Sequence, residues 1–85
     1  MKTIEAKTDA EFTALVEAAI LLAENPLKRE RGEQKFEAIA FERWSCDPEA
    51  RSLSFVANQH ALEAVGVRIP STATDVIELA NLLGL

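Results

Sequence analysis

The sequence predicts an all-α fold, a small four-helix bundle that occupies the single domain 1–85. Apolar residues recur at helical spacing in several segments, and short connections with proline or glycine separate these segments. The apolar share of 48% is too large for a disordered chain, and 85 residues suffice for one small core.

The first helix is expected from Thr8 to Asn25. Thr8 and Glu11 have the spacing of a capping box, in which the threonine caps the helix and the glutamate reaches back to its start. Asn25 precedes Pro26, and a residue before proline avoids the helical region, so the helix should end there. The apolar residues of this segment follow one helical face: Phe12, Leu15, Val16, Ala19, Leu22 and Ala23.

A charged connection, 27–34, is expected next, and we interpret its basic cluster 28–31 as a solvated turn. A second helix is expected around 36–44, because Glu37 and Ala38 interrupt the strict alternation of a strand. The segment 45–48 then breaks the pattern. The apolar face of this expected helix consists of Phe36, Ile39, Ala40 and Trp44.

The third helix has two alternative starts. Asp47 can cap it with Pro48 in its first position, or it can begin at Ser52. We expect it to end at Gly66, because glycine suits the left-handed position after a helix. Either start gives the same apolar face: Leu53, Val56, Ala57, His60, Ala61, Ala64 and Val65.

The last helix should follow an extended link at 67–70. Ser71 or Thr72 can cap it, and Asp75 in its first turn is favoured by the helix dipole. The residues expected to face inward are Val76, Leu79, Ala80 and Leu83.

From Ser52 to Leu83 the chain resembles the acyl carrier proteins, small acidic four-helix proteins that tether acyl chains. Ser52 and Leu53 match the serine and leucine that open the second helix of that family. Arg51 departs from the family pattern, which has aspartate there, and the segment after Pro70 is shorter than in the family. The other matches are Val56, Leu62-Glu63, the link Val67–Pro70, Asp75, Val76 and Leu79.

The resemblance implies that Ser52 carries the cofactor 4'-phosphopantetheine. Its thiol would hold an acyl or aminoacyl group as a thioester, and the protein would present this group to partner enzymes without catalysis of its own. A helix that begins at Ser52 would favour the phosphate through its free N–H groups and its dipole.

The alternative is a non-catalytic helical module for protein–protein interaction or regulation, without a cofactor. The pattern Leu79–Leu83 is typical of helices that dock in an apolar groove and also of core helices. One small core cannot hold every apolar side chain, and the surplus predicts docking on a larger protein or a homodimer. The surplus residues are Phe41, Trp44, Leu82, Leu83 and Leu85.

The charge and the remaining candidates exclude several other classes of function. The net charge is −5 with scattered acidic groups, which argues against nucleic acid, and no segment suits a membrane span or a signal peptide, so a cytoplasmic protein is expected. We expect no enzyme and no metal site, because the chain lacks a His/Cys cluster. Other candidates are interpreted as ordinary polar groups: Ser54 in place of Ser52, the pair Cys46 and His60, and the carboxylate pairs Glu30/Glu33 and Asp47/Glu49.

Overall fold

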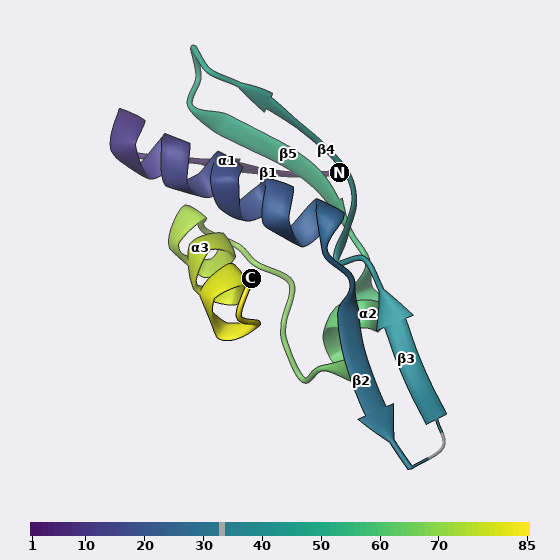
Figure 1. Cartoon of the computed structure of the whole chain (residues 1–85). Coiled ribbons are helices and arrows are strands. Elements are labelled where there is room, and N and C mark those ends of the chain that lie inside the picture. Colours follow the sequence, from purple (N-terminus) through teal and green to yellow (C-terminus); the bar gives the residue numbers. More distant parts are fainter. Residues whose placement is uncertain (33) are drawn as a thin grey trace.

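A computed structural model describes residues 1–32 and 34–85, with the backbone alone at 29–31 and 34. The chain forms a mixed α/β fold, so the prediction of an all-α four-helix bundle is wrong. Figure 1 shows the elements, which follow one another as β1 (Lys2–Glu5), α1 (Asp9–Glu24), β2 (Leu27–Arg31), β3 (Gln34–Ala38), β4 (Phe41–Asp47), β5 (Ser52–Ala57), α2 (Gln59–Ala64) and α3 (Ala73–Leu82).

The central strand of the main sheet is β5, which pairs antiparallel with β1 on one side and with β4 on the other. Leu53 and Phe55 are fully buried on one face, whereas Ser52 and Ser54 lie on the other. This alternation of serine with large apolar residues is typical of a half-covered strand. The helix expected from Asp47 or Ser52 is therefore wrong in its first half, and only Gln59–Ala64 is helical.

A β-bulge in β4 explains why its sequence resembles a helix. Phe41 pairs with Ala57 and Arg43 with Val56, so Glu42 is an extra residue on β4. The bulge brings residues 41 and 44, which have helical spacing, onto the same face of the sheet. The second helix expected around 36–44 is therefore wrong, because this stretch contains the end of β3 and the start of β4.

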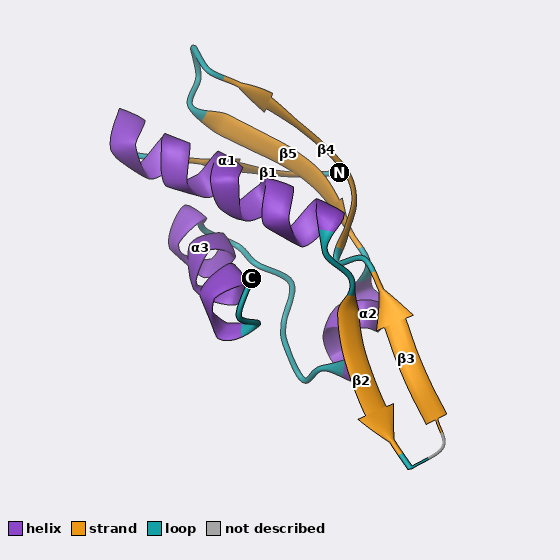
Figure 2. Ribbon diagram, viewed as in Figure 1, coloured by secondary structure: helices purple, strands orange, loops and turns teal. Residues whose placement is uncertain are grey.

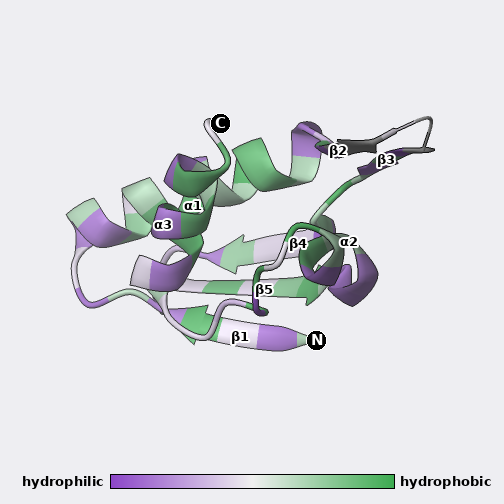
Figure 3. Ribbon diagram, turned by 90° about the horizontal axis from the view of Figure 1, so that it is seen from below, coloured by the Kyte–Doolittle hydropathy of each residue, from purple (hydrophilic) through white to green (hydrophobic). Residues whose placement is uncertain are grey.

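One face of the main sheet is covered by α1 and α3, which lie side by side (Figures 1 and 3). At its centre the rings of Phe41 and Phe55 stack with centroids 4.3 Å apart and planes 11° apart, so the prediction that Phe41 is surplus is wrong. The fully buried side chains of greatest volume are Phe41, Phe55, Leu15, Leu22, Leu53, Leu62 and Val76.

The prediction of the first helix is confirmed. Thr8 Oγ1 accepts a hydrogen bond from the N–H of Glu11 at 3.1 Å, as expected for the cap. The Glu11 carboxylate reaches back one residue further than in a capping box and accepts from the N–H of Lys7. The helix ends at Glu24, and Asn25 before Pro26 is extended.

The turn between β4 and β5 is tied to the start of α1. Asp47 accepts a hydrogen bond from the N–H of Glu49, so it stabilises a turn instead of capping a helix. Arg51 ends this turn with a φ of 49°, and its carbonyl accepts from the N–H of Ala6. The Arg51 guanidinium donates to Asp9 Oδ1 at 2.8 Å and to a backbone carbonyl at Lys7.

Strands β2 and β3 form a separate hairpin that projects at one end of the molecule (Figures 1 and 2). Gly32 in its turn has a φ of 63°, a conformation that hairpin turns require and that glycine adopts without strain. Lys28 pairs with Glu37 in the register, so opposite charges lie across the strands. The prediction that 28–31 forms a turn is wrong, since these residues lie in β2.

The C-terminal part follows the expected order of elements. Gly66, with a φ of 75°, comes directly after the C-terminal cap of α2, and the link 67–70 has no regular secondary structure. Of the two expected caps of α3, Thr72 holds the position and forms a capping box with Asp75. Among the helices that the structure describes, none is long and apolar enough to cross a membrane.

Candidate functional site

Ser52 lies at the start of β5, on the uncovered face of the sheet, and not at a helix terminus. The register places it between Glu5 of β1 and Asp47 of β4, both of them exposed. Cross-strand neighbours have Cβ atoms about 4.5–5.5 Å apart, so two carboxylates flank the hydroxyl and would repel a phosphate. The carrier function at Ser52 with 4'-phosphopantetheine stays a prediction, without the helix end on which it relied.

The other sequence candidates are spread over the surface. Ser54 shares the open face, where its hydroxyl contacts Thr3 Oγ1 at 3.0 Å. Cys46 is exposed in β4 and pairs with Leu53, which lies four residues, or roughly 13 Å, along β5 from Ala57 at the end next to α2. His60 is exposed on α2, so the structure does not bring these two residues together. Among the side chains that the structure describes, no group of three His, Cys, Asp or Glu residues is arranged to hold a metal. The pair Glu30/Glu33 lies outside these described side chains.

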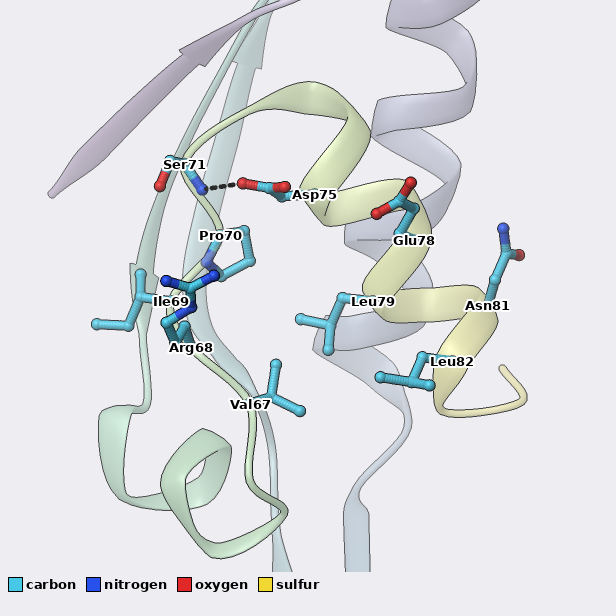
Figure 4. A pocket seen from close by; sticks show the side chains of 10 residues that line it. All are labelled: Val67, Arg68, Ile69, Pro70, Ser71, Asp75, Glu78, Leu79, Asn81 and Leu82. Atoms are coloured by element: carbon cyan, nitrogen blue, oxygen red, sulfur yellow. Dashed lines mark hydrogen bonds between the residues drawn. The ribbon is translucent and has the colours of Figure 1, made fainter.

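A groove of about 720 Å³ lies between the link and α3. The link follows one side, and α3 returns along the other (Figure 4). Figure 4 shows the side chains of Val67, Leu79 and Leu82 pointing into the space between the two walls. The complete lining is Val67, Arg68, Ile69, Pro70, Ser71, Asp75, Glu78, Leu79, Asn81 and Leu82.

Local sequence fixes both walls of this groove. Gly66 reverses the chain after α2, where the N–H of Val67 still donates to the carbonyl of Leu62. Pro70 is buried, and the residue before it favours an extended backbone. The opposite wall starts at the capped N-terminus of α3, whose buried face anchors it to the core. Both walls are therefore held in place independently of any ligand.

The polar residues of the groove carry charges of both signs. The Asp75 carboxylate accepts from the N–H of Ser71 at 3.0 Å and of Thr72 at 3.2 Å. The Ser71 bond, with smaller effects of Thr72 and the Arg68 charge, lowers the pKa of Asp75 below its ordinary value. Glu78 is exposed, and its carboxylate has no hydrogen bond or ion pair within the described part of the chain.

Leu82 is the most unusual residue of the groove, because 74% of it is exposed. Of the large apolar residues in the described segments, only Leu82 and Met1 are exposed to this degree. Leu79, by contrast, is 4% exposed and belongs to the core. The pattern Leu79–Leu83 thus contributes both to the core and to the surface, and the surplus predicted at Leu82 is confirmed.

Sequence reasoning treated the link only as a connection and as part of the carrier resemblance. The groove depends on how the link lies against α3, which no local spacing indicates; only the surplus at Leu82 pointed to this surface. Comparison with known proteins adds no family: no protein-family model, no curated protein and no solved structure matches this chain.

Proposed function

We propose that this protein is a non-catalytic interaction module that binds a partner protein in the groove between the link and α3. The exposure of Leu82 beside this groove carries the proposal. Burying a leucine side chain is worth about 1.5–3 kcal/mol, which an isolated molecule forgoes at this position. Leu82 is continuous with the apolar side chains that line the groove, and contiguous exposed apolar surface is typical of a protein-binding site.

The shape of the groove also favours a peptide segment of a protein. Its walls are one flank of a helix and a stretch of irregular chain, with apolar side chains facing inward and charges at the edges. Partner segments commonly lie along a fixed wall of this kind, where apolar anchors supply affinity and polar edges supply specificity. This supports the interaction module that the surplus of apolar residues predicts.

Site-specific photo-crosslinking in the cells that produce the protein tests the proposal. A benzophenone amino acid replaces Leu82 in one variant and Glu49, in the turn after β4, in the control. Both positions are exposed, so neither replacement should disturb the fold. We expect a defined adduct with another protein from position 82 only. Equal labelling from both positions, or none from position 82, would contradict the proposal, and an adduct of twice the chain mass would identify a homodimer.

A further inference from the structure

The backbone of the link offers hydrogen-bonding groups that the fold leaves unused. Within the described residues, the N–H and C=O groups of Arg68 and Ile69 have no hydrogen-bond partner. In an extended chain, the N–H and C=O of one residue point to the same side, and those of the next residue point to the opposite side. Arg68 and Ile69 therefore present an unused donor and acceptor on opposite sides of the link, and a segment bound alongside the link can pair with one of them.

Val67 on the link and Leu82 on α3 provide apolar anchoring positions on the two walls of the groove, whereas Leu79 is buried in the core. Val67 lies at one end of the link, and Leu79 and Leu82 face it from successive turns of α3 (Figure 4). An extended segment places alternate side chains on one side about 6.6 Å apart, while a helix turn advances 5.4 Å. Alternate apolar residues of a bound segment can thus contact successive positions of the groove.

The charges of the groove favour a basic occupant. Of the lining residues, Arg68 is the one cation, whereas Asp75 and Glu78 are anions, which gives a net charge of 1 − 2 = −1. Asp75 is already engaged by the N-terminal cap of α3, so Glu78 remains available. A second copy of the chain is disfavoured, because each copy has a net charge of −5.

We infer that the groove binds an extended segment of a partner protein in which apolar and basic residues alternate. The segment adds to the link by backbone hydrogen bonds at Arg68 or Ile69, its apolar residues contact Val67 and Leu82, and a basic residue lies near Glu78. This inference rests on the proposed function and specifies the chemistry of the partner.

Nuclear magnetic resonance titration with short capped peptides tests the inference on the full chain. The probe is acetyl-Leu-Lys-Val-Lys-Leu-amide, and its matched control carries glutamate in place of both lysines. We expect the basic peptide to shift the amide signals of Arg68, Ile69 and Leu82, and the acidic peptide to bind about tenfold more weakly. A third peptide, with the backbone N–H groups of its central residues methylated, should also bind about tenfold more weakly.

Two charge variants locate the basic residue of the occupant. Glu78→Gln should weaken binding of the basic peptide about fivefold, because it removes the available carboxylate of the groove. Glu17→Gln is the matched control, since Glu17 is an exposed glutamate on α1 and does not line the groove. Equal effects of the two variants would overturn the role of Glu78 and with it the basic character of the occupant.

The outcomes separate this inference from the proposed function. If position 82 crosslinks to a partner but the basic and acidic peptides bind equally, or if methylation of the peptide backbone changes nothing, the module stands and the extended basic occupant is overturned. The same holds if only a helical peptide of the same composition binds. If no peptide binds and position 82 captures no protein, both proposals are overturned.

Discussion

The main sheet and the β2–β3 hairpin are both antiparallel, yet they differ in what covers them. The main sheet has α1 and α3 over one face, and its central strand buries Leu53 and Phe55 completely. The hairpin pairs only with itself and projects from the end of the molecule (Figure 1). Leu27 is buried near its base and Phe36 is partly buried.

The difference shows that backbone pairing alone does not set local stability. A two-stranded hairpin is marginal in water, and a sheet becomes stable when a third strand and a packed face are added. The main sheet has both, whereas the hairpin depends on the few apolar contacts at its base. We therefore expect the two regions to respond differently to the same kind of change.

The largest expected effect comes from matched phenylalanine substitutions. Phe55→Ala should lower the free energy of unfolding by about 3–5 kcal/mol, because it leaves a cavity beside the ring of Phe41. Phe36→Ala in the hairpin should lower it by less than about 1.5 kcal/mol, since Phe36 is only partly buried. Urea denaturation of both variants measures the difference. Equal losses would show that the hairpin belongs to the core.

Hydrogen exchange should separate the same two regions without substitution. Amide hydrogens bonded in the β4–β5 ladder should exchange only on global unfolding, whereas those of the β2–β3 ladder should exchange on local opening, on the order of 100-fold faster. Residue-resolved exchange measured by nuclear magnetic resonance checks this. Similar protection in both ladders would contradict the expected difference.

A smaller effect is expected at α3, which helps to cover the main sheet. The pKa of Asp75 is lower in the folded than in the unfolded chain, so ionised Asp75 stabilises the fold above its ordinary pKa of 3.8. This contribution should be lost as the pH falls through the folded pKa, which lies below 3.8. Thermal unfolding of the protein and of Asp75→Ala between about pH 2 and pH 7 measures this contribution.

In that experiment the melting temperatures of protein and variant should differ most at neutral pH and approach each other in acid. A constant difference across the range would show that Asp75 acts through contacts that do not depend on its charge. Added salt should reduce the effect, because the carboxylate is fully exposed.

The smallest effect is expected on the open face of the main sheet. Ser54→Ala removes a hydroxyl whose contact with Thr3 is exposed, so the free energy of unfolding should change by no more than about 0.5 kcal/mol. Ser54 is adjacent to Phe55, which makes the two variants a direct comparison of the two faces of β5. A loss at Ser54 close to that at Phe55 would indicate that another element or molecule covers this face.

The helices could be predicted where their signals are local. Thr8 and Thr72 cap their helices through side chains a few residues away, and Gly66 and Pro26 act on their immediate neighbours. These features depend on short-range chemistry, which the sequence shows directly. The positions of both long helices were accordingly predicted correctly.

The strands could not be predicted from spacing alone. Phe41 and Trp44 have helical spacing because of the bulge at Glu42, and Leu53 and Val56 are compatible with a helix as well as with a strand. The strand conformation of β5 depends on pairing with β1, which is distant in sequence, and that of β4 depends on pairing with β5. The carrier hypothesis relied on Ser52 in a helix, whereas the exposed leucine of the groove followed from a simple surplus of apolar residues.

The ties made by Arg51 have a consequence for the order of folding. In the main sheet, Leu53 pairs with residues 7 and 49 positions earlier, Cys46 and Ile4. Closing a short loop costs less entropy than closing a long one, so the β4–β5 hairpin should form first and β1 should join late. Arg51 binds the segment between β1 and α1 through its carbonyl and its guanidinium. These contacts should therefore form after the transition state of folding. The contacts of Arg51 should lower the unfolding rate of the protein without raising its folding rate.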